Sequence, residues 1–104
     1  MTRYASGRRA EWAVRKRLES AGAIVVRSAG SKGPADLVAL FDYATFCVQV
    51  KRAKPTAAET EAVRAASAKT EARWAMVHYN DGIQDVKVFR KGKPHKLWPP
   101  GLVG

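Results

Sequence analysis

Residues 36–41 are the segment that most constrains how this chain can fold. After Asp36 the run is Leu-Val-Ala-Leu-Phe, so nearly every side chain is apolar. A strand that is apolar on both sides of its pleat belongs in the interior of a sheet, with cover on both faces. A loop dense in turn-forming residues precedes it at 28–34, and a turn follows at 42–44. The segment therefore predicts a central strand.

Hydrophobic periodicity indicates the other elements. Ala10, Val14, Leu18 and Ala21 form one apolar stripe of a helix over 6–21, with Ser6 as its N-cap and Gly22 as its stop. We expect strands at 23–27, 45–51, 74–79 and 85–89, and a second helix at 57–69. The order α-β-β-β-α-β-β predicts an α/β fold, a mixed sheet flanked by helices. We expect a single domain over 1–104, in which the proline-rich segment 91–104 is an irregular tail.

The charge balance indicates a polyanionic partner. The 104 residues include 19 Lys and Arg against 9 Asp and Glu, a formal net charge of +10. Nucleic acid is the first expectation and a membrane surface the second. No apolar run approaches the roughly 20 residues that span a bilayer, and residues 1–17 lack the apolar core of a secretory signal. The single cysteine, Cys47, excludes an internal disulfide and a thiolate zinc cluster. These features favour an intracellular protein that acts on nucleic acid.

Asp36, Gln49 and Lys51 form the candidate site. Gln49 and Lys51 lie two residues apart on one predicted strand, so both point to the same face. If strands 36–41 and 45–51 pair through the turn between them, Asp36 lies near Gln49. Glu11 borders the apolar stripe of the first helix and could reach the same sheet edge. The sequence thus gathers oxygen donors and one ammonium at a single place.

That combination of donors suits hydrolysis of a phosphodiester. Mg²⁺ prefers hard oxygen ligands and keeps several waters, so one or two side-chain oxygens and the backbone carbonyl of Val50 suffice. The metal neutralises charge that develops on the phosphate and lowers the pKa of a bound water. Lys51 can orient the water or stabilise the pentavalent state. We therefore expect Mg²⁺ as the cofactor, with Mn²⁺ able to replace it.

A dense set of motifs fills the first half of the chain. It comprises Tyr4, Gly7, Ala10-Glu11, the run Val-Val-Arg-Ser-Ala-Gly-Ser-Lys at 25–32, Asp36-Leu37-Val38-Ala39 and Val48-Gln49-Val50-Lys51. In these motifs the chain resembles the archaeal-type Holliday junction resolvases of the PD-(D/E)XK nuclease superfamily. The run before Asp36 is the most specific part, and the resemblance is vague after Pro55.

The resemblance implies a restriction-endonuclease-like fold and a homodimer whose two active sites cut opposed strands of a four-way DNA junction. Glu11, Asp36 and the Gln49 position would build the Mg²⁺ site, and Lys51 would be the catalytic lysine. Arg27 and Ser31 would contact the phosphate backbone and assist cleavage. The residues assigned to DNA binding are Arg8, Arg9, Arg27, Ser28, Ser31, Lys32, Arg52 and Lys54. Arg15, Lys16 and Arg17 are assigned to a solvated helix face.

Two positions depart from the family pattern. The family has Glu where this chain has Gln49, which removes one negative charge and predicts weaker Mg²⁺ binding or slower cutting. The glutamine is either natural or an inactivating change. Trp12 follows Glu11 where relatives often carry a basic residue. Trp12, Trp74 and Phe89 are predicted to lie in the core or in a dimer interface.

Two other functions remain open. The first is a different nuclease on the same fold, acting on mismatches, flaps or restriction-type sites. The second is a non-catalytic, basic DNA- or RNA-binding module. Gln49 leaves this function open, because it stands where the family has a catalytic-site Glu. The short chain is compatible with a viral or archaeal source.

Overall fold

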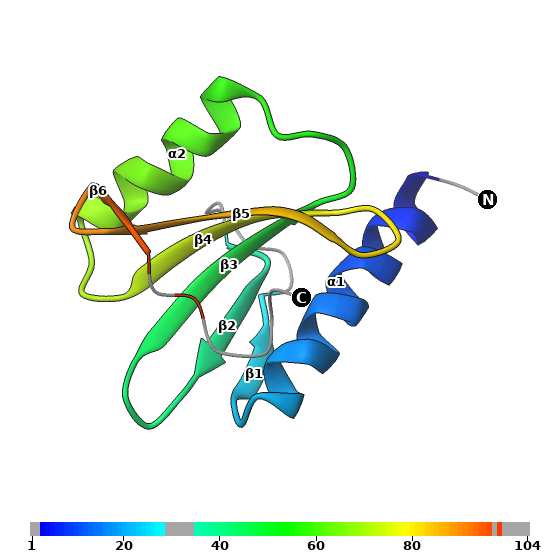
Figure 1. Cartoon of the computed structure of the whole chain (residues 1–104), viewed down its shortest axis with the longest axis horizontal. Helices are drawn as coiled ribbons and strands as arrows, with labels where there is room; N and C mark the ends of the chain where they lie inside the picture. The colour runs from blue at the N-terminus through cyan, green and yellow to red at the C-terminus, as the bar shows by residue number, and fades with distance from the viewer. Residues whose placement is uncertain (1–2, 29–34, 97, 99–104) are drawn as a thin grey trace.

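A computed structural model describes residues 3–28, 35–96 and 98, with side chains from Arg8 onward. The elements run in the order α-β-β-β-α-β-β-β, and the six strands form one sheet in the spatial order β1-β2-β3-β4-β5-β6 (Figure 1). The predicted mixed sheet flanked by helices is confirmed. The bounds are α1 Arg3–Ser20, β1 Ile24–Arg27, β2 Leu37–Leu40, β3 Thr45–Lys51, α2 Ala57–Ala68, β4 Arg73–Tyr79, β5 Ile83–Arg90 and β6 Lys93–His95.

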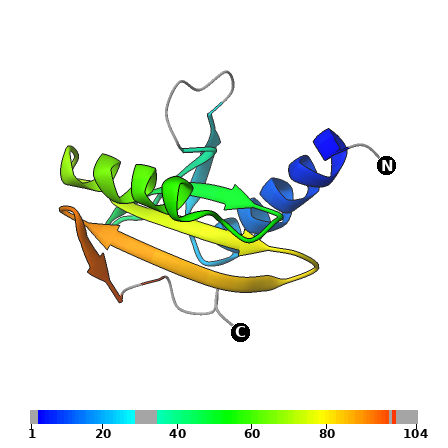
Figure 2. The same cartoon turned by 90° about the horizontal axis from the view of Figure 1, so that it is seen from above.

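One pair of strands sets the topology. β3 and β4 are parallel, whereas every other neighbouring pair is antiparallel. Parallel neighbours cannot be joined by a tight hairpin and need a crossover, which here is α2. α2 packs on β4, β5 and β6, while α1 packs on β1, β2 and β3 (Figures 1 and 2).

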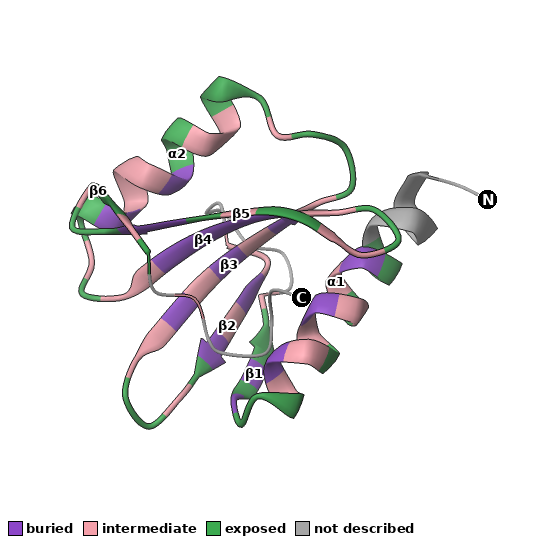
Figure 3. Ribbon diagram, in the orientation of Figure 1, coloured by how far each residue is buried: buried purple, intermediate pink, exposed green. Residues whose placement is uncertain are grey.

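The two helices cover opposite faces of the sheet, and β3 shows this by its alternation. Phe46, Val48 and Val50 are buried in a cluster with the α1 stripe of Ala10, Val14 and Leu18. The side chains between them, at Cys47, Gln49 and Lys51, are half-buried and point to the α2 side. A second cluster forms there from Val63, Trp74, Met76 and Phe89. The stripe of buried residues on α1 faces the sheet (Figure 3).

The ends of the first helix differ in how well the sequence predicts them. α1 begins at Arg3, so Ser6 lies inside the helix and is not its N-cap. Gly22 has a φ of +107°, in the left-handed region that favours glycine, and the helix ends just before it as predicted.

The prediction of an irregular tail over 91–104 is wrong at 93–95, where β6 pairs with β5. Lys91 and Gly92 both have positive φ, 55° and 79°, which is the backbone of a tight hairpin turn. Ser67 Oγ accepts the Gly92 N–H at 3.0 Å and fastens this turn to α2. β6 is an edge strand, so Pro94 is tolerated in it. Residues 97 and 99–104 lie outside the described part of the chain.

Three large aromatic residues were predicted to lie in the core or in a dimer interface, and the structure buries two of them and exposes the third. Trp74 and Phe89 are each 8% exposed and belong to the core, as predicted, whereas Trp12 is 61% exposed and does not. Ile24, Val26 and Leu40 on β1 and β2 are also exposed. In the described part of the chain, no helix is long and apolar enough to cross a membrane.

Candidate nucleic-acid and metal site

The candidate site lies at one end of the sheet, where β2 begins and its two neighbours end. The register pairs Leu37 with Arg27 on β1 and with Val48 on β3. Because both pairings are antiparallel, the last residues of β1 and β3 meet the first residue of β2 at the same edge. Arg27, Asp36 and the Gln49–Lys51 segment therefore come together, although up to 24 positions of sequence separate them.

Three hydrogen bonds hold Asp36 immediately before β2. Its backbone N–H donates to the carbonyl oxygen of Val48 at 2.8 Å, and its own carbonyl accepts the N–H of Ser28 at 2.9 Å. Its side-chain Oδ2 accepts the backbone N–H of Val50 at 2.9 Å. Asp36 is thus tied to the chain that follows β1 and to β3. The sequence proposed the carbonyl of Val50 as a metal ligand, which stays a prediction; the structure shows that the N–H of the same residue binds Asp36.

The Asp36 carboxyl is half-buried, and burial raises its pKa above the ordinary value. The hydrogen bond from Val50 opposes that rise. The negative charge of Glu11 adds to it, while the positive charges of Lys51 and Arg27 lower the pKa. Glu11 and Arg27 are joined by an ion pair, and the strand register brings Arg27 and the end of β3, with Lys51, beside Asp36. Two carboxyl groups and two cations therefore share this end of the sheet.

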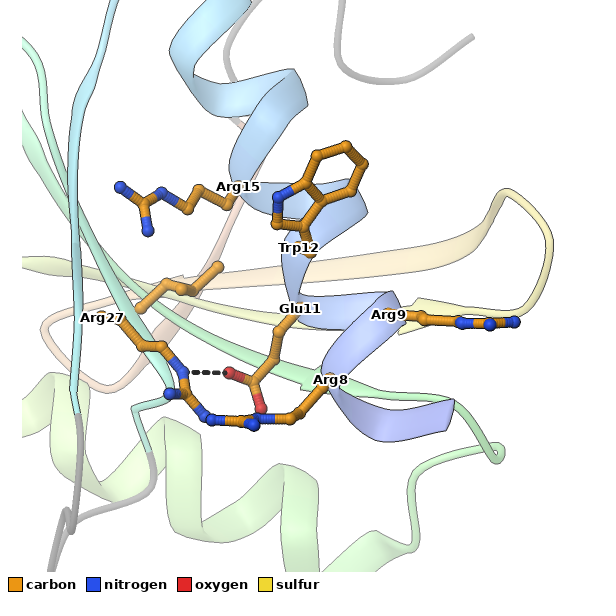
Figure 4. Close-up of a pocket in the computed structure, with 7 residues that line it drawn as sticks. Arg8, Arg9, Glu11, Trp12, Arg15 and Arg27 are labelled. Atoms are coloured by element: carbon orange, nitrogen blue, oxygen red, sulfur yellow. Dashed lines mark hydrogen bonds and ion pairs between the residues drawn. The ribbon is translucent and has the colours of Figure 1, made fainter. Parts of the chain in front are cut away.

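Glu11 reaches the site from α1. Its Oε1 accepts a hydrogen bond from Arg27 Nε at 3.3 Å, and Figure 4 shows the two side chains turned toward each other. The Glu11 side chain is 22% exposed and that of Arg27 is 40% exposed. The ion pair links the helix to the end of β1 and holds one carboxylate at the sheet edge. Glu11 thus lies at the edge that the sequence assigned to it.

Lys51 is paired with a residue that the sequence analysis missed. Its Nζ lies 2.6 Å from Oε2 of Glu59, in the first turn of α2. Glu59 also closes a capping box, because its carboxylate accepts the N–H of Thr56 while its own N–H donates to the Thr56 hydroxyl. The pattern Thr-x-x-Glu after Pro55 was the available signal. Lys51 and Thr56 lower the pKa of Glu59, so this carboxylate is ionised at neutral pH.

Gln49 carries a buried oxygen without a partner. Its Oε1 makes no hydrogen bond among the residues that the structure describes. A buried, unpaired acceptor is costly, so such an atom in a folded protein points to a missing partner. A cation would supply that partner, and the hard oxygens of Glu11, Asp36 and Gln49 suit Mg²⁺. The described residues contain no cluster of three or more His, Cys, Asp or Glu side chains that could hold a metal. This donor set is therefore two carboxylates and one neutral amide.

Most of the predicted DNA-binding residues are exposed around this end of the sheet or on α1. Ser28 is half-buried and donates its N–H to Asp36. Ser31 and Lys32 lie outside the described residues. The exposed residues are Arg8, Arg9, Arg27, Arg52 and Lys54.

Cys47 lies on the same face of β3 as Gln49, but burial raises the pKa of its thiol. A protonated thiol is a weak nucleophile. The Cys47 thiol is therefore poorly suited to act as a nucleophile at this site.

A cavity of about 320 Å³ opens beside Glu11, between α1 and the β1–β2 strands. It is lined by Arg8, Arg9, Glu11, Trp12, Arg15, Arg27 and Leu37 (Figure 4). The sequence analysis assigned Arg15 to a solvated helix face. Its side chain is 40% exposed, and it also lines the cavity, which the sequence did not predict. The spacing of Arg8, Trp12 and Arg15 along the helix was the missed signal, since residues four and seven apart share one helix face.

Several chains of solved structures have a similar architecture. One of them is Hjc of Archaeoglobus fulgidus, a Holliday junction resolvase from an archaeal hyperthermophile. The similarity has a TM-score of 0.60 and covers 90% of this chain and 80% of that one, at 20% sequence identity. This chain has the fold of a Holliday junction resolvase. No protein-family model and no curated protein sequence matches the chain.

The hydrogen bond between Asp36 and Val50 generates a stability prediction. We expect Asp36→Ala to lower the free energy of unfolding by about 1–3 kcal/mol, because the buried Val50 N–H loses its acceptor. Asp36→Asn should stay near the wild-type value, since an amide oxygen can accept the same N–H and the replacement removes a charge that burial disfavours. Urea unfolding at neutral pH without divalent metal measures both.

Asp42 offers a matched control, because it is exposed in the turn after β2. Asp42→Ala should change the free energy of unfolding by no more than about 0.5 kcal/mol. Equal losses in Asp36→Ala and Asp42→Ala would show that the bond to Val50 does not contribute.

Proposed function

We propose that this protein is a structure-selective endodeoxyribonuclease that resolves four-way DNA junctions by Mg²⁺-dependent phosphodiester hydrolysis, giving paired nicks. The observation that carries the proposal is the meeting of Asp36, Gln49, Glu11 and Lys51 at one end of the sheet. The net charge of +10 and the resolvase fold support the choice of DNA as substrate.

The residues divide the work by their chemistry. Glu11, Asp36 and Gln49 would hold Mg²⁺ through their side-chain oxygens. When bound, the metal neutralises phosphate charge and lowers the pKa of a water. Lys51, as a compact ammonium, would stabilise the extra negative charge of the pentavalent phosphate.

The cations around the site would position the DNA. Arg27 is the last residue of β1, is exposed and is paired with Glu11. Its planar guanidinium can bind a phosphate oxygen there. Arg8, Arg9, Arg52 and Lys54 would bind neighbouring phosphates. Such contacts position the DNA without reading its bases, so recognition would follow the shape of the junction.

Paired nicks require two active sites, and we propose that a second copy of the chain supplies the other one. Ile24 on β1 is 70% exposed and lies opposite Leu40 on β2, which is 42% exposed, and Val26 is 52% exposed. β1 is also an edge of the described sheet. An exposed apolar patch on an unpaired edge strand favours association with another chain. A two-fold dimer would match the two-fold symmetry of a four-way junction.

A non-catalytic junction-binding module is the second candidate, and two observations favour it. Gln49 brings no negative charge to the metal site, and the ammonium of Lys51 is already held by Glu59. Such a module would bind branched DNA tightly, with an affinity that falls steeply with salt, and would not cut it with any metal.

Cleavage of a labelled, immobile four-way junction tests the proposal. With Mg²⁺ or Mn²⁺ we expect paired nicks in opposed strands, and no nicks in a linear duplex of the same sequence. Changes in the outer shell of a metal site already cost about 10–100-fold. Asp36→Asn removes the negative charge of a direct ligand and should therefore slow cleavage at least about 100-fold, although this variant should fold normally.

Asp42→Asn is the control for that experiment, since it makes the same chemical change at an exposed turn. Its rate should equal that of the wild type. Tight junction binding without cutting at any metal concentration would identify the binding module instead. Equal cutting of junction and linear duplex would point to a different nuclease.

Gln49→Glu tests the effect of the missing charge. A third carboxylate should strengthen Mg²⁺ binding, lowering the Mg²⁺ concentration for half-maximal cleavage by roughly tenfold. Calorimetric titration of Mg²⁺ into the protein gives the same comparison without DNA. Gln84→Glu adds the same charge at an exposed residue of β5 and should leave both values unchanged. Equal Mg²⁺ affinities for the wild type and Gln49→Glu would contradict a role for this side chain as a ligand.

A further inference from the structure

Trp12 is the largest side chain that the fold leaves exposed. Its indole is 61% exposed, and it lies on α1 directly after Glu11. Lys16 Nζ lies 5.3 Å from the ring centroid, so one cation is already near the indole. An aromatic ring has two faces, and the large exposed area of this one leaves room for a flat ligand. The core does not account for a tryptophan at this place.

The cavity that Trp12 lines has both apolar and positively charged side chains in its lining. Leu37, which is 1% exposed, belongs to its lining and gives it an apolar wall. Arg8, Arg15 and Arg27 also line it, against the single acidic residue Glu11. Trp12 and Arg15 project from α1, and Arg27 comes from β1 (Figure 4). A ligand for this cavity needs a flat, apolar face for the indole and an anionic group for the guanidinium groups.

Arg15 and Arg27 keep donors for such a ligand. Arg15 pairs with Glu19 through Nε at 3.4 Å, and Arg27 pairs with Glu11 through Nε at 3.3 Å. A guanidinium has five N–H donors, so a contact through Nε alone does not exhaust it. Planar guanidinium groups bind phosphate oxygens in pairs. A nucleotide meets both requirements, since its base stacks on aromatic rings and its phosphate binds arginine.

The cavity adjoins the candidate active site. Glu11 lines the cavity and is ion-paired with Arg27, and Leu37, the residue directly after Asp36, lines it too. A nucleotide in the cavity would therefore lie next, along the same strand, to the phosphate presented to the proposed metal site at Asp36 and Gln49. A volume of about 320 Å³ lies at the lower end of the range of small-molecule sites, about 300–1,000 Å³.

We propose that this cavity binds one unstacked nucleotide of the DNA strand at the branch point, with its base on the indole of Trp12 and its phosphate on the surrounding arginines. The inference rests on the proposed function for its substrate. Taking a base out of a helix costs unstacking and unpairing energy, and the unstacking part is smaller at a branch point, where the continuous helical stack is interrupted. A linear duplex has no such interruption and pays the full cost. Trp12 thus selects branched DNA before any chemistry occurs.

A double-mutant cycle between the protein and the DNA tests the proposal. Binding to a four-way junction is measured without divalent metal, and an abasic site is moved through each nucleotide next to the branch point. Trp12→Ala should weaken binding of the intact junction about 5- to 150-fold, the effect of losing one base stack. With the abasic site at the stacked nucleotide, Trp12→Ala should have no further effect, because both changes remove the same contact.

Further variants and measurements serve as controls for the cycle. Trp12→Phe should restore most of the affinity, whereas Trp12→Lys, which introduces a cation and has no ring, should not. Tyr43→Ala removes another exposed aromatic ring, 51% exposed in the turn between β2 and β3, and should leave binding unchanged. Linear duplex should bind wild type and Trp12→Ala equally. The thermal midpoint of Trp12→Ala should match the wild type, because the residue is not in the core.

The outcomes separate this inference from the proposed function. Additive losses at every abasic position, or an equal loss with linear duplex, would overturn the stacking role while leaving junction cleavage intact. A change of oligomeric state in Trp12→Ala, with additive cycles, would assign Trp12 to a protein interface instead. Failure of the wild type to prefer a junction over a linear duplex would overturn both proposals.

Discussion

The parallel pairing of β3 with β4 determines where the functional side chains can lie. Because parallel neighbours need a crossover, the chain leaves β3 at Lys51, turns at Pro55 and enters α2 on one face of the sheet. The first turn of α2 therefore begins beside the end of β3, which brings Glu59 within 2.6 Å of Lys51. α1 covers the other face and delivers Glu11 to the same sheet end. The candidate site is the place where both helices and three strands converge.

The charges at this place are balanced before any ligand arrives. Glu11 is paired with Arg27 and Lys51 with Glu59, and all four side chains are partly exposed. Ion pairs exposed to solvent contribute only about 0–1 kcal/mol each. Exchanging them for contacts to a metal ion and a phosphate would therefore cost little. Asp36 differs, because burial already raises its pKa and a backbone N–H holds its carboxyl in place. The fold therefore fixes the position of the Asp36 carboxyl, whereas the side chains of the two ion pairs can rearrange when a ligand binds.

The sequence predicted the elements well because each has a strong local signal. β3 carries an alternating pattern that matches its bounds, and the apolar stripe of α1 shows Ala10, Val14 and Leu18 as its buried face. β6 was missed because its signal is a two-residue turn at Lys91-Gly92 followed by a proline, a pattern that usually indicates a loop. Register is also partly local, since a short turn between β2 and β3 leaves few ways to pair them. Asp36 could therefore be placed near Gln49 from the sequence.

The contacts between separate elements could not be predicted in this way. Glu59 meets Lys51, and Arg15 meets the cavity, only because of how the helices cross the sheet, and no local pattern encodes those crossings. The exposure of Trp12 has the same origin, because burial of an aromatic residue depends on what packs over it. The sequence thus identified the oxygen-bearing side chains at the sheet end. It did not identify Glu59, which pairs with Lys51, or the residues that line the neighbouring cavity.

Crystals soaked in Mn²⁺ and measured at the manganese absorption edge would show whether this end of the sheet binds a metal ion. We expect an anomalous peak at coordinating distance from the side-chain oxygens of Glu11, Asp36 and Gln49, and its loss in Asp36→Asn. A peak at another place, or none in protein that cuts junctions with Mn²⁺ in solution, would contradict the assignment of the sheet end as the metal site.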